Sequence, residues 1–296
     1  MALEALREVG SEGRRANVSS GLYVLDVKLL FTRARALAIV CVCSIVALLA
    51  LRVFPDSIFA GVAYLNSILS FVLLGFLGLA LVSIFKVQVR EFFGMPARTK
   101  ASFLTIGVAA LLSLPPIIFV DTEGRSLEIS ALGLLFILSI GFGEEIFNRG
   151  FVFGFLKRHG EYFGLFFSSA IFGLLHLNRY LGGNWDSWKA YSHVLSAAAV
   201  GFFICALMMV TKSIWVAVIF HALADWHLGF KSIDDKTSEI AKPSLLDNLL
   251  DPVVGVGLYS IFGVLILWVN TGMKLSPRIE AILNRLKIIE QETEAV

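Results

Sequence analysis

The stretch GLLFILSIGFGEEIFNRGFVFGFL, residues 133–156, decides the fold class of this chain. It is long enough to cross a bilayer, since a membrane helix needs about 20 predominantly apolar residues. Three ionisable residues nevertheless lie in its middle, namely Glu144, Glu145 and Arg149. Charged side chains are costly at that depth, and where they occur they usually mark a functional site. The segment therefore predicts a membrane protein with chemistry inside one of its spans.

The chain as a whole has the composition of a polytopic membrane protein. Of its 296 residues, 57% are hydrophobic and 16% are charged, whereas soluble domains carry about 25% charged residues. The mean hydropathy is +0.80. We predict an all-α transmembrane bundle of about eight spans, because apolar runs near the spanning length recur at residues 34–54, 58–85, 103–120, 128–156, 162–180, 190–211, 213–230 and 252–271. The run at 103–120 is interrupted by Pro115 and Pro116.

The basic residues give the predicted bundle an orientation. With the N-terminus inside, seventeen of the 25 Lys and Arg residues fall on the cytoplasmic side, seven fall on the opposite side, and Arg149 lies within a span. This excess follows the positive-inside rule. We therefore predict that both termini are cytoplasmic, which requires an even number of spans.

The spans divide the chain into a membrane core and flanking segments. Residues 272–296 contain Ile279, Leu283, Leu286 and Ile289 at helical spacing, which favours an amphipathic helix that lies either on the inner leaflet or against the bundle. The net charge of +2 follows from the topology, so we expect no nucleic-acid partner. The predicted segments are a cytoplasmic N-terminal segment (1–33), N-terminal transmembrane helices (34–127), a transmembrane core (128–230), an outer loop (231–251), a last transmembrane helix (252–271) and a cytoplasmic tail (272–296).

Helix packing explains two of the three charged residues of the opening stretch but not the third. Residues four apart share a face of a helix, so Glu145 and Arg149 form a natural ion pair in which each lowers the cost of burying the other. Glu144 points elsewhere, and its nearest polar neighbour on the same face is the uncharged Asn148. Packing alone therefore leaves Glu144 unexplained and makes it a candidate general base or acid.

Other spans offer partners for these residues. His176 follows Phe172 by four positions, and His221 precedes Asp225 by four positions, so imidazole and carboxyl share one helix face. Counting about 1.5 Å per residue from the predicted span ends places His176, His221 and Glu144 at compatible depths. We expect these side chains to converge. The alternative is that each histidine is an ordinary core residue and that the charged pair only stabilises packing.

Two kinds of amide hydrolysis fit this set of residues. In one, a glutamate deprotonates a water molecule while the imidazoles and the carboxyl group orient it and stabilise the oxyanion. In the other, Glu144, His176 and His221 hold zinc, and the metal-bound water is the nucleophile. The sequence contains neither H-E-x-x-H nor G-x-S-x-G, so it gives no support to a serine hydrolase or a zincin.

Three short motifs resemble those of a known protease family. EEIFNR (144–149), FGLLH (172–176) and HALAD (221–225) are similar to the E-E-x-x-x-R, F-x-x-x-H and H-x-x-x-[N/D/B] motifs of the CPBP family. That family comprises the type II CAAX prenyl endopeptidases and the bacterial Abi, or bacteriocin-processing-like, membrane proteins. The resemblance covers residues 128–230, which makes this segment the expected catalytic core. It also implies an integral protein of a bacterial plasma membrane.

The resemblance implies roles for individual residues. By position, Glu144 activates the water, Glu145 and Arg149 support it, and the oxyanion is held by His176, His221 and Asp225. The prenyl endopeptidases favour Asn where this chain has Asp225, so Asp225 must be protonated, paired with a histidine, or a metal ligand. Zinc therefore stays open as a cofactor.

The expected partners are membrane lipid and a peptide or protein substrate at the membrane. Prenylated peptides, bacteriocin leaders and lipidated signalling peptides are all open as substrates, and the oligomeric state is left open. Two other functions remain as alternatives: a non-enzymatic scaffold or immunity-type membrane protein that keeps the polar network for packing, and a transporter whose Glu and His residues relay protons.

Overall fold

The computed structural model describes residues 27–53, 62, 64–120, 125–180, 187–230 and 245–270. Residues 1–26 of the predicted N-terminal segment, most of the predicted outer loop and the predicted amphipathic tail lie outside these residues. Every regular element in the described part of the chain is helical, so the predicted all-α class is confirmed.

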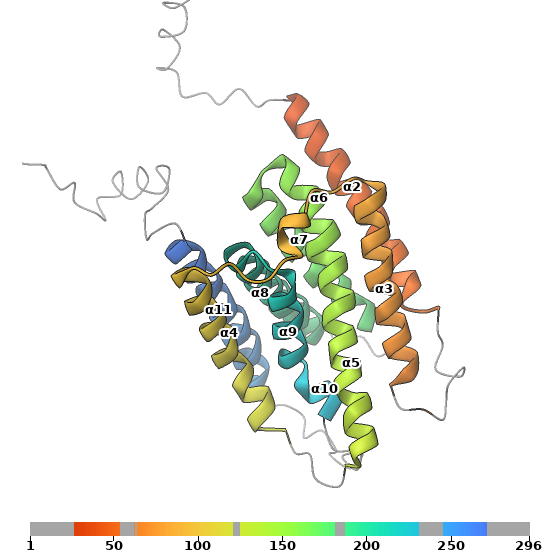
Figure 1. Ribbon diagram of the computed structural model, residues 1–296, viewed down its shortest axis with the longest axis vertical. Helices are drawn as coiled ribbons and strands as arrows, with labels where there is room; N and C mark the ends of the chain where they lie inside the picture. Colours follow the sequence, from red (N-terminus) through yellow and green to blue (C-terminus); the bar gives the residue numbers. More distant parts are fainter. Residues whose placement is uncertain are drawn as a thin grey trace, which may run out of the picture.

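Of the first four long helices, Val27–Ala50, Leu65–Ile84 and Leu127–Glu145 lie together on one side of the bundle, whereas Lys100–Ile118 lies on the opposite side (Figure 1). The fourth of them continues without a break through a π-helical stretch, a short α-helix and a 3-10 turn. In chain order they are α2 (Val27–Ala50), α3 (Leu65–Ile84), η1 (Arg90–Phe92), α4 (Lys100–Ile118), α5 (Leu127–Glu145), η2 (Ile146–Phe153), α6 (Gly154–Leu156) and η3 (Lys157–His159).

The C-terminal half supplies the remaining elements. They are α7 (Glu161–Leu175), η4 (His176–Tyr180), α8 (Ser187–Thr211), α9 (Ile214–Ala224), α10 (Trp226–Phe230) and α11 (Leu245–Asn270). Within the bundle, α8 packs between α7 and α11, whereas α5 packs between α3 and α9. The two histidine-bearing regions, at the ends of α7 and α9, are thereby brought to the helix that carries the charged stretch.

Each of the eight predicted apolar runs contains a helix. Five helices of the described residues are long and apolar enough to cross a membrane, namely Lys28–Ala50, Leu65–Ile84, Lys100–Ile118, Leu127–His159 and Trp188–Thr211. Three more apolar helices are shorter, namely Glu161–Leu175, Ile214–Ala224 and Gly255–Asn270. These helices support an integral membrane protein, while the count of eight spans and the orientation of the termini stay predictions.

Helix α4 keeps its predicted place despite two prolines. Thr99 caps its start by accepting a hydrogen bond from the Ser102 backbone N–H at 3.1 Å. Pro115 and Pro116 lie in the last turn before Ile118, so the helix loses few internal hydrogen bonds to them. Ser126 caps α5 in the same way, through the backbone N–H of Ile129.

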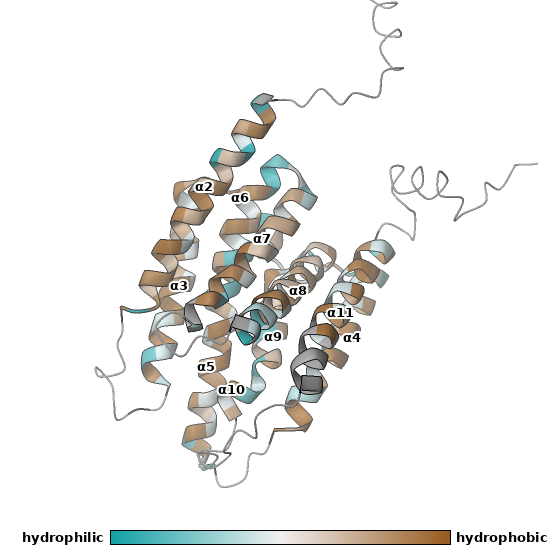
Figure 2. Ribbon diagram, turned by 180° about the vertical axis from the view of Figure 1, so that it is seen from behind, coloured by the Kyte–Doolittle hydropathy of each residue, from teal (hydrophilic) through white to brown (hydrophobic). Residues whose placement is uncertain are grey.

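The distribution of polarity is that of a membrane bundle. Large apolar side chains such as Phe76, Leu111 and Ile219 are exposed on the outer surface, and most helical residues are hydrophobic (Figure 2). The interior, by contrast, encloses Glu145 and Arg149, which are 0% and 1% exposed. An apolar exterior around a charged interior suits a hydrocarbon solvent, in which charges are tolerated only inside the bundle.

Loops predicted to share the cytoplasmic side meet at one end of the bundle. Arg33 donates a hydrogen bond to the His159 backbone oxygen at 3.0 Å. Arg158 donates to the backbone oxygens of Phe85 and Lys86. These contacts join the start of α2, the end of α3 and the η3 turn, as the predicted topology requires.

Two glycines let α5 approach its neighbours closely. A Cβ at Gly141 would lie 2.5 Å from the Val218 backbone oxygen of α9, and one at Gly143 would lie 2.3 Å from the Phe71 backbone oxygen of α3. No real Cβ tolerates such distances, so these positions require glycine. Small residues at helix contacts are the usual means of close packing within membranes. They place the charged end of α5 directly between α3 and α9.

Candidate active site

Glu144 and Glu145 end α5, and the π-helical η2 begins with the next residue. Stretches of π-helix are rare and are frequently found at functional sites. Arg149 lies within η2, and its Nε is 3.0 Å from Glu145 Oε2. The ion pair at positions i and i+4 therefore forms, and both partners are buried.

Arg149 is held by groups from two further helices. Its guanidinium donates a hydrogen bond to the Gly201 backbone oxygen of α8 at 2.9 Å. The guanidinium carbon also lies 4.5 Å from the centre of the Phe172 ring of α7, a cation–π geometry that strengthens where water is excluded. A Cβ at Gly201 would lie 3.3 Å from the guanidinium and 2.9 Å from the Phe172 ring, so glycine makes room for both.

His221 of α9 connects the buried pair to the other carboxyl groups. Its Nδ1–H donates a hydrogen bond to Glu145 Oε1 at 2.6 Å, because a carboxylate paired with arginine only accepts. On the other edge of the ring, Nε2 lies 3.8 Å from Glu144 Oε2 and 3.5 Å from Asp225 Oδ2. Glu145 thus fixes the orientation of the imidazole and directs Nε2 toward Glu144 and Asp225.

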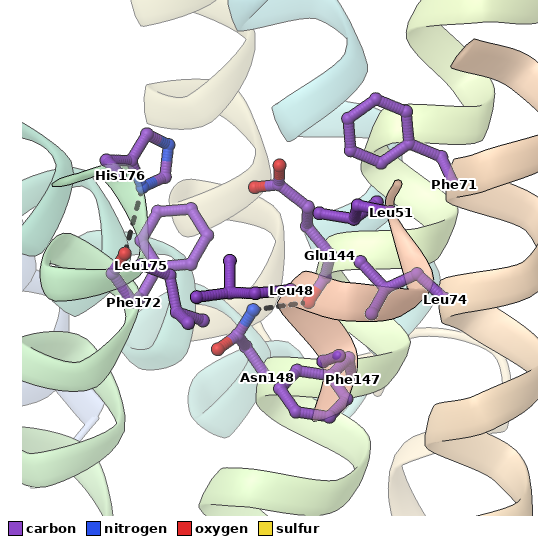
Figure 3. Close-up of a pocket in the computed structure, with 11 residues that line it drawn as sticks. Leu48, Leu51, Phe71, Leu74, Glu144, Phe147, Asn148, Phe172, Leu175 and His176 are labelled. Carbon is purple, nitrogen blue, oxygen red and sulfur yellow. Dashed lines mark hydrogen bonds between the residues drawn. The ribbon is translucent and has the colours of Figure 1, made fainter. Parts of the chain in front are cut away.

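Glu144 lines a cavity of about 160 Å³, which we call the Glu144 cavity. The Glu144 side chain is 14% exposed. Glu144, Asn148 and His176 are the polar members of the lining (Figure 3). The apolar members are Ala47, Leu48, Leu51, Phe71, Leu74, Phe147, Phe172 and Leu175. A mostly apolar cavity with a few placed polar groups is typical of a ligand site.

His176 faces the same cavity from the end of α7 (Figure 3). Its Nδ1–H donates a hydrogen bond to the Phe172 backbone oxygen at 2.9 Å, which directs Nε2 the other way. The centres of the His176 and Phe172 rings are 4.8 Å apart, and the His221 ring is 5.8 Å from that of Phe172. Phe172 therefore contacts both imidazoles.

The structure brings five of the six predicted site residues into one connected network: Glu144, Glu145, Arg149, His221 and Asp225. The sixth, His176, shares the Glu144 cavity and packs on Phe172. Their catalytic roles stay predictions. Asp225 lies against His221, which corresponds to the histidine-paired state among the three that the sequence left open.

Two further residues belong to the site and were not predicted. Asn148 lines the Glu144 cavity, and its Nδ2 donates a hydrogen bond to the Glu144 backbone oxygen at 2.9 Å. His193 of α8 lies with its ring 5.2 Å from that of His176, and it is hydrogen bonded to the Tyr180 hydroxyl at 3.0 Å. The only signal in the sequence was the spacing of Asn148 from Glu144, one helical turn away.

The described residues do not present a metal site. No group of three or more His, Cys, Asp and Glu side chains in this part of the chain is arranged to hold a metal ion. Within the predicted zinc set, Nδ1 of His221 is bound to Glu145 and Nδ1 of His176 to a backbone carbonyl, as is common where Nε2 of a histidine binds a metal. Because the described carboxylates and imidazoles do not gather into a metal site, we derive no step through a metal, and zinc stays a prediction that a chelator can test.

A comparison with protein families places part of the chain beside a known protease family. Residues 126–227 match the family model described as "Type II CAAX prenyl endopeptidase Rce1-like". This segment resembles the protease core of that family. The match spans all three motifs and confirms the resemblance to the CPBP family. No curated protein matches the chain significantly.

The Rce1-like core confirms that the chain is an enzyme of the protease class. It supports a CAAX-type intramembrane endopeptidase in general terms, with a peptide substrate at the membrane. The alternative of a non-enzymatic scaffold is therefore not pursued. The family match does not specify the nucleophile or the substrate.

Proposed function

We propose that this protein is an intramembrane endopeptidase that cleaves a peptide bearing a prenyl or other apolar lipid group, with a water activated by Glu144. The observation that carries the proposal is the position of the Glu144 carboxyl group. It lies in the wall of a mostly apolar cavity and 3.8 Å from an imidazole nitrogen that a buried ion pair holds in place. An acid in this setting has space for substrate on one side and a fixed polar partner on the other.

The reaction starts with a proton transfer. Glu144 accepts a proton from water, and the resulting hydroxide attacks the carbonyl carbon of the peptide bond. The C–N bond then breaks as Glu144 returns the proton to the leaving amine, so the products are a carboxylic acid and an amine. Glu144 begins and ends each cycle ionised.

The imidazoles stabilise the charge that develops on the carbonyl oxygen. Preorganised N–H donors at this point are commonly the largest single contribution to catalysis of acyl transfer. Because Nδ1–H of His176 is bound to the Phe172 oxygen, Nε2 donates to the charged carbonyl oxygen when the ring is an imidazolium. Glu145 and Arg149 act through His221, since they hold its ring in position. Asp225 balances charge at Nε2 of His221.

The lining of the cavity supports an apolar substrate group. Eight of the lining residues are aliphatic or aromatic, and they come from α2, the turn that follows it, α3, η2 and α7. An isoprenoid chain gains about 25 cal/mol for each Å² that it buries in such a wall. The lipid anchor of the substrate would then lie beside the base, in the same layer as the surrounding membrane.

The test is hydrolysis of a prenylated peptide by the purified protein in proteoliposomes. The peptide ends in a prenylated Cys, two aliphatic residues and one further residue. We expect Glu144→Gln to lower kcat by about 100- to 10,000-fold, the range of general acid–base catalysis, while the protein stays folded and inserted. Glu128→Gln is the matched control, because Glu128 lies exposed in the first turn of the same helix. Full activity of Glu144→Gln would refute the assigned base.

Two further measurements refine the proposal. A peptide without the prenyl group should be cleaved at least tenfold more slowly, and equal rates would show that the cavity does not bind the lipid. A chelator added in parallel tests the zinc alternative. Activity that is lost with the chelator and restored by zinc would replace the metal-free route.

A further inference from the structure

His193 of α8 is a half-buried ring beside the site that the proposed reaction does not use. Its ring centre lies 5.2 Å from that of His176, with the two ring planes at 79°. Its Nδ1 is hydrogen bonded to the Tyr180 hydroxyl at 3.0 Å. His176 and Tyr180 are the first and last residues of η4, the 3-10 turn that follows α7. His193 therefore joins both ends of this turn to α8.

His176 lies where the regular helix ends. Helix α7 stops at Leu175, and the 3-10 turn that begins with His176 has poorer hydrogen-bond geometry than an α-helix. The bond from His176 Nδ1 to the Phe172 oxygen does not by itself fix the plane of the imidazole. Phe172 belongs to the same helix, so its ring moves with the end of α7. His193 adds a contact from α8, which ties the imidazole to a second helix.

The ring of His193 is itself held in place by Tyr180. The two rings pack at 5.8 Å with their planes at 75°, and edge-to-face contact is a preferred geometry of aromatic pairs. Because a hydroxyl both donates and accepts, the bond to Nδ1 forms with either tautomer of His193. Among the described residues, the lining of the Glu144 cavity includes neither His193 nor Tyr180, so any effect of these two on the reaction passes through His176.

We propose that His193 is a positioning residue: together with the Tyr180 hydroxyl, it holds the His176 imidazole so that Nε2 faces the carbonyl oxygen of the substrate. This inference rests on the proposed function, in which His176 stabilises the charge on that oxygen. Such stabilisation depends on a donor that is fixed, before the reaction, at the place where the charge develops. A ring that turns loses this contact in the transition state, while the substrate still binds in the cavity. Loss of His193 should therefore lower kcat and leave KM nearly unchanged.

The test measures hydrolysis of the prenylated peptide in proteoliposomes by variants of the two supporting residues. We expect His193→Ala to lower kcat by about 10- to 100-fold, the cost of misplacing a catalytic group by about 1 Å, with KM within about twofold of the wild-type value. Tyr180→Phe removes the hydroxyl and keeps the ring, so it should lower kcat by about two- to tenfold, the range of one ordinary hydrogen bond. His227→Ala and Tyr191→Phe are the matched controls, because both side chains are exposed, and they should leave kcat unchanged.

A double-mutant cycle separates positioning from a purely structural role. If His193 acts through His176, then His193→Ala should change kcat by less than about twofold in a protein that already carries His176→Ala. That protein keeps a measurable rate, because loss of one oxyanion donor costs about 100- to 1,000-fold. A structural role would instead lower kcat by the same factor in both backgrounds, together with the unfolding midpoint in detergent.

His193→Phe serves as a second variant in case alanine perturbs folding. It keeps a ring beside His176 but loses the bond to Tyr180, so it should match Tyr180→Phe, and combining the two should cause no further loss. An unchanged kcat in His193→Ala overturns this inference alone, as does an equal loss with and without His176. Absence of cleavage by the wild-type protein overturns the proposed function and this inference with it.

Discussion

Arg149 determines the geometry of the site without lining the Glu144 cavity. It neutralises Glu145, Glu145 orients His221, and His221 presents Nε2 to Glu144 and Asp225. The Arg149–Glu145 and Glu145–His221 links are buried, where an unpaired charge is far more costly than at a surface. Loss of Arg149 should therefore lower the free energy of unfolding directly. It should lower the rate of catalysis indirectly, through the position of His221.

We expect Arg149→Met to destabilise the protein by about 3–5 kcal/mol, because it leaves the Glu145 carboxylate buried without its counter-charge. Adding Glu145→Gln to this variant should restore much of the stability but little activity, since His221 no longer has a charged partner. Unfolding in detergent and peptide cleavage are the two measurements. Arg35→Met, at an exposed position, should change stability by no more than about 0.5 kcal/mol. An equal effect at both arginines would contradict the assigned role of Arg149.

At the scale of single residues, the sequence predicts the charged residues of the site but not the Asn148 side chain. Helical spacing alone pairs Glu145 with Arg149, and similar depths predict that His221 approaches Glu144. The place of Asn148 in the wall of the Glu144 cavity could not be predicted, because it depends on how α2, α3 and α7 pack around η2. The contact of His193 with His176 joins two separate helices and has no local signal.

Among the elements, α5 is placed by contacts that no larger residue can make. Gly141 meets a backbone oxygen of α9, and this contact sets the distance between Glu145 and His221. The π-helical η2 then carries Arg149 back toward Glu145. The position of the apolar helices could be predicted from hydropathy, but these contacts could not, since they depend on how helices meet.

We expect Gly141→Ala to cost about 1–3 kcal/mol, because the new methyl group forces α5 and α9 apart. Cleavage should fall as well, since the Glu145–His221 hydrogen bond lengthens. The matched control is Gly107→Ala on α4, where a Cβ meets nothing within 4 Å. That change should be neutral or stabilise the helix by up to about 1 kcal/mol. Unfolding midpoints in detergent compare the two, and equal effects would contradict the packing argument.

The connection between η1 and η3 predicts a small pH effect. Lys157 donates a hydrogen bond to Glu91 at 2.5 Å and holds the pKa of that carboxyl below its ordinary value of 4.5. A lowered pKa stabilises the folded state above the ordinary value, and the contribution is lost as the pH falls through the lowered one. Because the Glu91 side chain is 57% exposed, we expect less than about 1 kcal/mol.

Glu91→Gln tests this effect through unfolding measured across pH. The variant should be slightly less stable than the wild-type protein at pH 7, and the two curves should converge as the pH falls below the ordinary carboxyl pKa. A difference that persists unchanged in acid would show that the ion pair is not its cause.

For the whole molecule, the contacts of Arg33 and Arg158 gather loops that the positive-inside rule assigns to the cytoplasm. The opposite end has its own contacts, including the Tyr64 hydroxyl with the Gly229 backbone oxygen at 3.4 Å. Charge counting therefore predicts correctly which loops lie together. Which end faces the cytoplasm is a property of the membrane and needs a separate experiment.

Labelling of single introduced cysteines can determine the orientation. The native Cys41, Cys43 and Cys205 are first replaced by alanine. Met95 and Leu127 are matched positions, 87% and 88% exposed, at opposite ends of the bundle. We expect an impermeant maleimide added to intact cells to label Leu127→Cys and not Met95→Cys. Disruption of the membrane should expose both. The reverse pattern in intact cells would invert the predicted topology.

The residues that line the Glu144 cavity come from two parts of the chain. Its polar groups lie within residues 126–227, whereas Ala47, Leu48, Leu51, Phe71 and Leu74 lie outside that segment. Mutations in the first helices can consequently change which substrates are accepted while the hydrolytic machinery stays intact. Divergence of selectivity among enzymes of this architecture is therefore expected to concentrate in α2 and α3, and exchanging these helices between related proteases should exchange their preferences.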